Sequence, residues 1–373
     1  MKIKAAVLRT MGSVPPYSKS KPLSIEEVEL NPPRHGEVLV KIGAVSLCHS
    51  DLSVINGTRP RPMPMVLGHE AAGTVVQVGD GVDDLVSGDH VVMVFMPSCG
   101  HCLPCSEGRP ALCEPAAIAN SKGEMLSGGS RLYIQSEAIY HHMGCSAFAD
   151  YAVVSRRSLV KVDKDIPFEE AALFGCAVLT GVGTVVNTAK VQVGQTVAVI
   201  GLGGVGLAAV LGAVASGAAQ VIAIDVSDAK LNLAKELGAT MVINALEMDV
   251  VEQVRSFTTG GVDFALEFSG VARALDGAYR MTRRGGTTVT AGLPPPDAAL
   301  AVNIVNMVVE ERTVKGSYIG TCVPVRDIPR YMALFKEGRL PVNKLMSGII
   351  PLDKINEGFD RLHDGSVLRL VIM

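Results

Sequence analysis

The stretch that decides the fold is residues 193–225, VGQTVAVIGLGGVGLAAVLGAVASGAAQVIAID. Val197–Ile200 and Gln220–Ile224 are short runs rich in β-branched residues, which is typical of buried parallel strands. Leu207–Ser216, between them, consists mostly of small apolar residues and is predicted to be a helix. Strand, glycine-rich turn, helix and strand in this order predict a βαβ unit of a doubly wound α/β domain.

The glycine-rich turn between the first strand and the helix has the spacing G-x-G-x-x-G. Gly201 permits the tight turn, Gly203 lets the backbone approach a pyrophosphate, and Gly206 lets the helix pack closely on the strand. The free N–H groups at the start of the helix attract phosphate. A carboxylate at the end of the second strand can accept hydrogen bonds from ribose hydroxyls. We therefore expect a dinucleotide to contact Gly201, Gly203, Gly204, Val205, Gly206 and Asp225.

The composition limits the other functions that this chain can have. The uncharged run 191–224 is long enough for a membrane span, but repeated glycines interrupt it, so we interpret it as the core of a parallel sheet. With 373 residues, 48% hydrophobic and 19% charged, the chain is long enough for two domains. A net charge of −3 gives no argument for a nucleic-acid or membrane partner. Because the N-terminus carries no apolar segment of signal-peptide length, we predict a cytoplasmic protein.

The cysteines are clustered in a way that favours metal binding over disulfides. The eight positions are 48, 99, 102, 105, 113, 145, 176 and 322. Cys99, Cys102 and Cys105 are separated by two residues each, and Cys113 follows eight positions later, within a lobe of about 97–115. Four thiolates satisfy tetrahedral Zn²⁺ and leave no open position, so this site should be structural. An iron–sulfur cluster also takes four thiolates, and a lobe without metal is the third alternative.

The remaining segments divide into a β-rich part and an alternating part. Runs typical of strands are 4–8, 23–28, 38–45, 90–95, 148–154 and 159–162, followed after residue 191 by 241–243, 264–267 and 287–291. Helices are expected over 229–237, 250–257, 271–281 and 328–337. We interpret 114–147 as irregular. The paired His141 and His142 could bind a metal, but we interpret them as lying on the surface of a lobe. Leu300–Val309 is expected to be an edge strand that pairs across a subunit interface.

Three further positions combine residue types that suit a metal site, although each has a plainer interpretation. Cys48-His49-Ser50-Asp51 follows the strand 38–45, and His69-Glu70 stands at a turn into an apolar strand. Cys176 lies within an apolar stretch. A buried cysteine in a polar loop, a structural histidine and a core cysteine would give the same pattern. The residues alone leave these alternatives open.

Together these features resemble the zinc-dependent medium-chain alcohol dehydrogenases, in the long form with a four-cysteine structural zinc lobe. The resemblance covers essentially the whole chain. Its motifs are Cys48-His49-Ser50-Asp51, Gly68-His69-Glu70-Ala-Ala-Gly73, the cysteine lobe, Cys176, Gly201-Leu-Gly-Gly-Val-Gly206, Asp225 and Arg369. It implies a Rossmann domain (178–319) inserted into a GroES-like, mainly β catalytic domain (1–177 and 320–373). In that family, substrate and cofactor meet in the cleft between the two domains.

The resemblance also implies a catalytic zinc site. It assigns Cys48, His69 and Cys176 as ligands, with a fourth position open for water or alcohol. Asp51 matches the carboxylate that orients the histidine ligand. Glu70 matches the acid behind the metal, either as a transient ligand or as structural support. Ser50 matches the hydroxyl that takes the substrate proton.

For the cofactor, the resemblance places His49 and Arg369 at the pyrophosphate and Lys230 at a ribose, although surface solvation also explains Lys230. Asp225 favours NAD over NADP, since a carboxylate repels a 2′-phosphate. Some relatives end the proton relay in a histidine where this chain has Ser53, so we expect proton release through water.

Substrate-pocket positions by the same resemblance are Phe95, Ile118, Met143, Leu293 and Tyr318. They suggest an apolar pocket for aliphatic or aromatic alcohols. Arg59 and Arg61 fall near the entrance, where they either select an anionic substrate or stay solvated.

The function that follows is a zinc-dependent alcohol dehydrogenase with two zinc ions per subunit. It transfers hydride reversibly between a primary or secondary alcohol and NAD, giving an aldehyde or ketone. Zinc lowers the pKa of the alcohol, so that an alkoxide forms near neutrality. A homodimer or homotetramer is expected. One alternative is oxidation of a thiol adduct, as in glutathione-dependent formaldehyde dehydrogenase. The other is a non-catalytic, nucleotide-sensing zinc protein.

Overall fold

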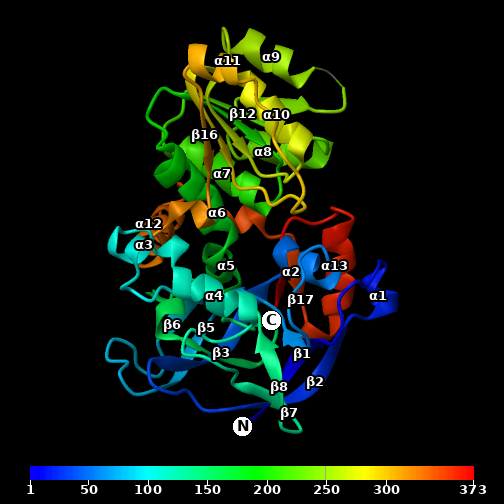
Figure 1. The fold of residues 1–373 in the computed structure, drawn as a ribbon, viewed down its shortest axis with the longest axis vertical. Helices are drawn as coiled ribbons and strands as arrows, with labels where there is room; N and C mark the ends of the chain where they lie inside the picture. The colour runs from blue at the N-terminus through cyan, green and yellow to red at the C-terminus, as the bar shows by residue number, and fades with distance from the viewer. Residues whose placement is uncertain (248) are drawn as a thin grey trace. The chain divides into compact units, whose positions relative to one another are not determined.

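The computed structural model describes residues 1–247 and 249–373, which form two compact units (Figure 1). Unit 1 comprises Met1–Cys176, Val323–Arg330 and Asn343–Met373. Unit 2 comprises Ala177–Cys322 and Tyr331–Val342. Unit 1 is therefore interrupted in sequence by unit 2. The arrangement is a mainly β unit interrupted by an α/β unit with a parallel sheet, as the predicted fold class requires.

One part of unit 1 is a closed barrel in the order β1-β2-β7-β8-β4. Its strands are β1 (Lys2–Leu8), β2 (Leu23–Leu30), β4 (Met65–Val66), β7 (Leu132–Ile134) and β8 (Glu137–His141). Apolar residues that alternate along the strands, such as Ile3, Val7 and Val28, face inward and form a core. Polar residues at the intervening positions of β2 stay exposed.

The second sheet of unit 1 carries the residues of interest at its strand ends. Its order is β10-β6-β5-β3-β18-β17, and β9 also pairs with β3. The strands are β3 (Glu37–Ser46), β5 (Glu70–Val78), β6 (His90–Met93), β9 (Tyr151–Ser155), β10 (Leu159–Val162), β17 (Gly348–Ile350) and β18 (Leu370–Ile372). Ser46 pairs with both Glu70 and Val371, so the end of β3, the start of β5 and the last strand meet at one edge.

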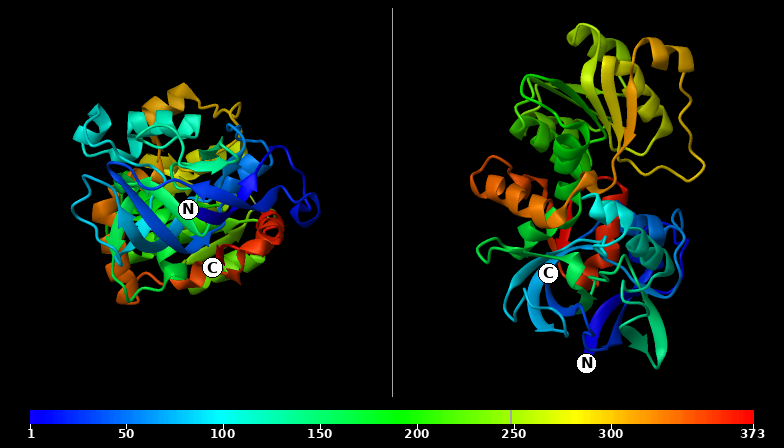
Figure 2. Two further views of the ribbon diagram at one scale, coloured as in Figure 1. Left: turned by 90° about the horizontal axis from the view of Figure 1, so that it is seen from below. Right: turned by 60° about the vertical axis from the view of Figure 1, so that its left-hand side comes forward.

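Unit 2 contains a six-stranded parallel sheet in the order β13-β12-β11-β14-β15-β16. The strands are β11 (Thr196–Ile200), β12 (Gln220–Asp225), β13 (Met241–Asn244), β14 (Val262–Glu267), β15 (Thr282–Thr290) and β16 (Thr313–Gly316). Helices α7 (Gly204–Ala215), α8 (Asp228–Glu236), α9 (Val250–Phe257) and α10 (Ala272–Met281) connect them, and α7 packs on β11 and β12. Figure 2 gives two further views of the ribbon, in which these helices are coloured green to yellow.

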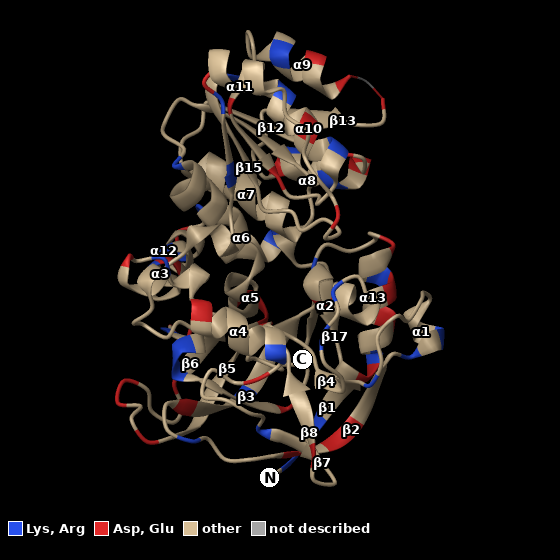
Figure 3. Ribbon diagram, in the orientation of Figure 1, with Lys and Arg blue, Asp and Glu red and all other residues tan. Residues whose placement is uncertain are grey.

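The run 191–224 is divided into strand β11, helix α7 and strand β12. Figure 3 shows α7 without Lys, Arg, Asp or Glu, and most of its side chains are buried. Across the described part of the chain, no single helix has the length and apolarity to cross a membrane. One bent pair, Phe168–Gly175 with Ala177–Ala189, passes that test by length and composition alone.

The other helices lie mostly in connections. They are α1 (Tyr17–Ser20), α2 (His49–Ile55), α3 (Leu103–Ser106), α4 (Glu114–Lys122), α5 (Phe168–Ala172), α6 (Ala177–Gly183), α11 (Ile304–Val309), α12 (Pro324–Lys336) and α13 (Ile355–His363).

Two sequence predictions about local structure are wrong. Leu300–Val309 is not an edge strand, because Asn303 caps a helix over Ile304–Val309 by accepting a hydrogen bond from the Asn306 amide. The edge of the sheet is β16 instead. The segment 114–147 is not irregular, since it contains α4, β7 and β8. Short, polar strands of this kind give a weak periodic signal.

Candidate functional site

Three residues that are far apart in sequence meet in unit 1. Cys48 precedes α2 at the end of β3, His69 precedes β5, and Cys176 follows a short 3₁₀ turn over Leu173–Gly175. All three side chains are buried, and their ligand atoms lie within 4.8 Å of one another. The pairing of Ser46 with Glu70 explains how Cys48 and His69 come together.

These three residues fit a zinc ion. His69 Nδ1 lies 3.1 Å from Asp51 Oδ1, which favours the tautomer that leaves Nε2 free to bind a metal. His69 Nε2 is buried and has no hydrogen-bond partner among the described residues. Two sulfurs and one imidazole nitrogen form one of the donor sets found in catalytic zinc sites, in which the fourth position stays open.

The two thiols influence each other strongly. The hydrogen bond with Cys176 lowers the pKa of Cys48 well below its usual value, with help from Arg369 and His69 against the effect of burial. The same hydrogen bond, together with burial, raises the pKa of Cys176. These opposite shifts reflect the close contact of the two thiols, and zinc binding would convert both to thiolates.

A buried ion pair stands beside this cluster. Arg369 Nη1 lies 3.2 Å from Glu70 Oε2 and donates a hydrogen bond of 3.0 Å to the Leu47 carbonyl. Burial lowers the pKa of Arg369, but attraction to Glu70 and to the thiols more than offsets this and raises it. Glu70 thus faces Arg369, which is compatible with its expected place behind the metal. Pyrophosphate binding by Arg369 stays a prediction.

Asp51 is the hydrogen-bond partner of His69, the candidate zinc ligand. Its Oδ1 also accepts a hydrogen bond of 3.1 Å from the Gly68 amide and lies 3.1 Å from His142 Nδ1. Burial raises the pKa of Asp51, but the two histidines and their hydrogen bonds lower it to about 2. Asp51 is therefore a carboxylate that orients His69.

The prediction that His141 and His142 lie on the surface of a lobe is wrong. Both side chains are buried. His141 ends β8 on its inward face, and its Nε2 accepts a hydrogen bond of 3.1 Å from the Arg131 amide. His142 faces Asp51. The alternation of Ile139 and His141 along β8 was the available signal, because both face the interior.

The other predicted residues of unit 1 are distributed more widely. The Phe95 ring is buried and meets the His69 ring edge-on, with 5.3 Å between centroids. Met143 directly follows His142 and has a positive φ of 52°. Ile118 is 57% exposed on α4, so its side chain lies largely in solvent. Ser50 lies in the first turn of α2, and the Ser53 hydroxyl donates to the His49 carbonyl at 2.9 Å.

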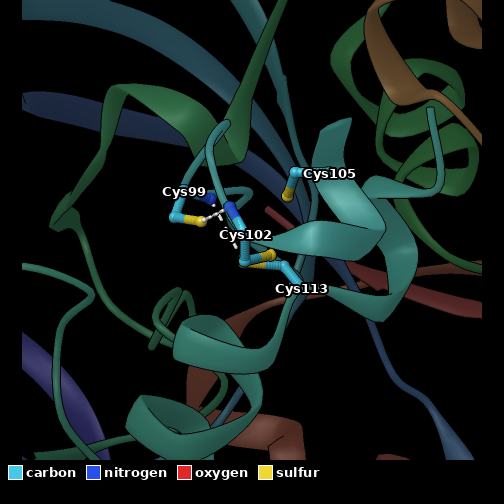
Figure 4. Close-up of side chains that lie close together, drawn as sticks. All are labelled: Cys99, Cys102, Cys105 and Cys113. Atoms are coloured by element: carbon cyan, nitrogen blue, oxygen red, sulfur yellow. Dashed lines mark hydrogen bonds between the residues drawn. The ribbon is translucent and has the colours of Figure 1, made fainter. Parts of the chain in front are cut away.

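The four-cysteine lobe brings together all of its predicted ligands. The sulfurs of Cys99, Cys102, Cys105 and Cys113 lie within 4.8 Å of one another and point toward a common centre (Figure 4). The Cys99 amide donates to Cys113 Sγ at 3.2 Å, and the Cys102 amide donates to Cys99 Sγ at 3.3 Å. Gly100, with a φ of 85°, allows the chain to turn around this centre. The four donors suit zinc without an open position.

In unit 2, the glycine turn has the geometry that the motif requires. Gly201 has a φ of 87°, and a Cβ there would lie 2.7 Å from the Ser269 nitrogen. A Cβ on Gly206 would lie 1.9 Å from the Gly201 carbonyl oxygen, so only glycine fits. A Cβ on Gly203 would meet no atom within 4 Å. The first and third glycines therefore serve packing, while the second borders open space at the start of α7.

Asp225 ends β12, and backbone amides hold its carboxylate. Oδ2 accepts a hydrogen bond of 2.6 Å from Leu202, and Oδ1 accepts from Val226 and Ser227 at 2.9 and 3.0 Å. Lys230 lies on the neighbouring helix α8. Leu293 and Tyr318, predicted for the substrate pocket, are 56% and 37% exposed. The roles of these residues stay predictions.

Comparison with known proteins defines the class. Residues 34–164 match the alcohol dehydrogenase GroES-like domain, and residues 204–337 match the zinc-binding dehydrogenase family. The chain belongs to the zinc-dependent medium-chain dehydrogenase family and is an oxidoreductase of the zinc alcohol dehydrogenase type.

Several solved structures resemble this chain over its whole length. An alcohol dehydrogenase zinc-binding domain protein from Burkholderia ambifaria is 36% identical with a TM-score of 0.94, and the match covers 100% of this chain and 98% of that one. Benzyl alcohol dehydrogenase from Acinetobacter calcoaceticus is 33% identical with a TM-score of 0.93 and coverage of 100% and 99%. A protein from Sinorhizobium meliloti 1021, described as a zinc-binding dehydrogenase bound to NADP, is 26% identical with a TM-score of 0.82 and coverage of 100% and 99%.

Proposed function

We propose that this protein catalyses the reversible oxidation of a primary or secondary alcohol by NAD⁺ to an aldehyde or ketone, NADH and a proton. One observation carries the proposal: Cys48, His69 and Cys176 are buried together, and His69 Nε2 has no hydrogen-bond partner among the described residues. A buried polar atom without a partner is costly, and a bound metal would remove that cost.

The mechanism assigns a separate task to each residue. When held by Cys48, His69 and Cys176, zinc supplies Lewis-acid chemistry that lowers the pKa of an alcohol. Asp51 fixes the tautomer and the orientation of His69. Ser50 accepts the alcohol proton and passes it to water. Position 53 is a serine instead of the histidine of some relatives, and its hydroxyl is hydrogen-bonded to the backbone of α2, so we assign it no part in the proton relay.

The test of this proposal is metal analysis combined with steady-state kinetics. We expect two zinc ions per chain, one for each cluster, and NAD⁺ reduction with alcohols. Cys48→Ser should remove one zinc ion and the activity, while leaving the other zinc ion bound. A nucleotide-sensing zinc protein would instead hold a single zinc ion and reduce no NAD⁺ with any alcohol.

For the substrate, we propose aromatic primary alcohols ahead of small aliphatic and secondary ones. The benzyl alcohol dehydrogenase of Acinetobacter calcoaceticus, at 33% identity, supports this order. The buried Phe95 ring beside His69 offers the apolar contact that an aromatic ring would need. The values of kcat/KM for benzyl alcohol, 1-hexanol and 2-butanol decide the order, and a preference for 2-butanol would contradict it.

For the cofactor, we propose NAD rather than NADP. The Asp225 carboxylate, fixed by three amides at the end of β12, would repel a 2′-phosphate. The Sinorhizobium meliloti protein, at 26% identity, was solved with NADP, so the shared fold does not by itself decide the cofactor. Asp225→Ser should lower the ratio of kcat/KM for NAD⁺ to that for NADP⁺. An unchanged ratio would contradict the proposed role.

Arg61 supports a second candidate, the oxidation of a thiol adduct that carries carboxylates. Burial is the main cause that lowers the pKa of His142, and the positive charge of Arg61 adds to this effect, which places Arg61 near that ring. The Nε atom of Arg61 is buried. Formaldehyde oxidation with and without glutathione separates the two candidates. A rate that depends on glutathione and falls in Arg61→Gln would favour the adduct.

We further propose a homo-oligomer. Helix α11 exposes Ile304, Val305 and Val308 by 76%, 68% and 69%. It lies next in sequence to β16, at the open edge of the sheet. Light scattering after size exclusion should show a dimer or tetramer, and Val308→Lys should weaken it. A cytoplasmic location stays a prediction from the sequence.

A further inference from the structure

His142 is a buried histidine that the mechanism described above does not use. Its Nδ1 lies 3.1 Å from Asp51 Oδ1, the same oxygen that lies 3.1 Å from His69 Nδ1. The Gly68 amide donates to this oxygen as well, at 3.1 Å. One carboxylate oxygen is thus shared by three groups, and two of them are imidazoles. The Oδ2 atom of Asp51 has no hydrogen-bond partner among the described residues.

The rings of the two histidines also touch. The His142 and His69 rings meet edge to face, with 5.5 Å between centroids and 84° between planes. Phe95 meets the His69 ring in a similar way from a different part of the chain. His69 is therefore fixed by Asp51 through Nδ1 and by two rings through packing. Only its Nε2 faces the thiols of Cys48 and Cys176.

The loop after β8 holds His142 in place and contains two residues in a strained backbone conformation. The His142 amide donates to Ser146 Oγ at 3.0 Å, and the Cys145 amide donates to the His142 carbonyl at 3.0 Å. Met143 and Ser146, neither of them glycine, both have a φ of 52°. Non-glycine residues rarely adopt this conformation, and such strain persists where the surroundings enforce it, often at functional sites.

Packing alone does not explain a histidine at this position. Its side chain is fully buried, and neither ring nitrogen meets the geometry of a hydrogen bond among the described residues. An apolar ring of the same shape would avoid these unpaired nitrogens. What His142 adds over such a ring is a polar nitrogen, Nδ1, that lies 3.1 Å from Asp51 Oδ1.

We propose that His142 is a positioning residue for the catalytic zinc: with its Nδ1 3.1 Å from Asp51 Oδ1, it holds in place the carboxylate that aims His69 Nε2 at the metal. This inference rests on the proposed zinc ion at Cys48, His69 and Cys176. Without His142, Asp51 can rotate about its side-chain bonds and bring its free oxygen to His69. The metal should then be held less firmly, although all three ligands remain.

The experiment measures the transfer of zinc from the holoenzyme to a chromophoric chelator. Zinc release is expected in two kinetic phases, one for each zinc ion. The phase that is missing in the Cys48→Ser variant belongs to the catalytic site. Loss of a partner of a zinc-bound histidine typically weakens metal binding by about 10–100-fold. Since His142 acts through Asp51, we expect about a tenfold faster catalytic-site phase in His142→Phe, at the lower end of that range. The phase from the cysteine lobe should not change.

Two further variants separate positioning from a general structural role. His142→Asn keeps an N–H donor near the position of Nδ1, so it should restore a rate close to that of the wild type. His141→Phe removes the adjacent buried histidine, whose Nε2 accepts from Arg131 and does not face Asp51. It should leave the catalytic-site phase unchanged, even if the melting temperature falls.

The outcomes are distinct. The proposal is overturned if His142→Phe releases zinc at the wild-type rate, or if His141→Phe accelerates release to the same extent. It is also overturned if His142→Asn releases zinc as fast as His142→Phe. If wild-type enzyme shows only the lobe phase and Cys48→Ser changes nothing, the proposed catalytic zinc itself fails, and His142 loses its role with it.

Discussion

A single methyl group at Gly203 should separate dinucleotide binding from folding. Gly203 precedes α7 with a φ of −70°, a conformation open to any residue. A Cβ there would meet no protein atom within 4 Å, so Gly203→Ala creates no clash within the chain. If a pyrophosphate approaches this backbone, however, the methyl group occupies its place.

The expected magnitudes follow from this geometry. Alanine is a poorer N-cap than glycine by roughly 0.5–1 kcal/mol, but the loss of unfolded-state freedom returns about 0.4–1 kcal/mol. The free energy of unfolding should therefore stay nearly constant. Loss of one amide–phosphate hydrogen bond removes about 1.5–3 kcal/mol of binding energy. That corresponds to a Kd for NADH raised by about 10–100-fold.

The assay is a titration of NADH followed through its own fluorescence, since the chain contains no tryptophan. Gly277→Ala, on α10 with its nearest foreign atom 4.0 Å away, is the matched control and should bind NADH normally. Gly206→Ala should instead fail to fold properly, because its Cβ would lie 1.9 Å from the Gly201 oxygen. Normal NADH binding by Gly203→Ala would refute the assignment of the turn to the pyrophosphate.

Other predictions concern buried charges and the cysteine lobe. Burial raises the pKa of Glu37, but hydrogen bonds from Arg131, Ser127 and the Arg34 amide lower it overall. The contribution of Glu37 and Arg131 to the free energy of unfolding should therefore be fully present above the pKa of an unfolded glutamate, about 4.3. It should be lost as the pH falls through the lower pKa that Glu37 has in the folded protein. Glu37→Gln alone should cost about 3–5 kcal/mol at neutral pH in urea unfolding, since Arg131 stays buried. Glu267 accepts hydrogen bonds from Ser269, Gly270 and Thr290, so Glu267→Gln should lower stability by about 2 kcal/mol, measured in the same way. Cys113→Ser should release the lobe zinc and lower the melting temperature, while the zinc content remaining should equal one ion per chain; loss of both ions would contradict independent sites.

The local patterns predicted the parts of the fold that depend on neighbouring residues. The β-branched runs of β11 and β12 and the glycines between them lie close together in the chain, so the sequence alone indicates a βαβ unit. The four cysteines of the lobe are similarly local, and their spacing is sufficient to predict the cluster.

The catalytic cluster could not be predicted from spacing. Cys48, His69 and Cys176 meet because β3 pairs with β5 and because the chain returns after β10 through α5 and a 3₁₀ turn. Such long-range pairing leaves no periodic signal at the ligands themselves. The family resemblance identified these three residues as zinc ligands. It did not identify a role for His142, because the sequence around it indicates an irregular and exposed segment.

The two functional clusters fall in different units, and this makes their roles separable. All three proposed zinc ligands, together with Asp51 and His142, belong to unit 1, while the glycine turn and Asp225 belong to unit 2. Each cluster is complete within its own unit, since its hydrogen bonds come from residues of that unit. Gly203→Ala should therefore leave the zinc content intact, and Cys48→Ser should leave NADH binding intact. The proposed reaction requires both, so either variant alone should abolish or weaken turnover through a different, measurable deficit.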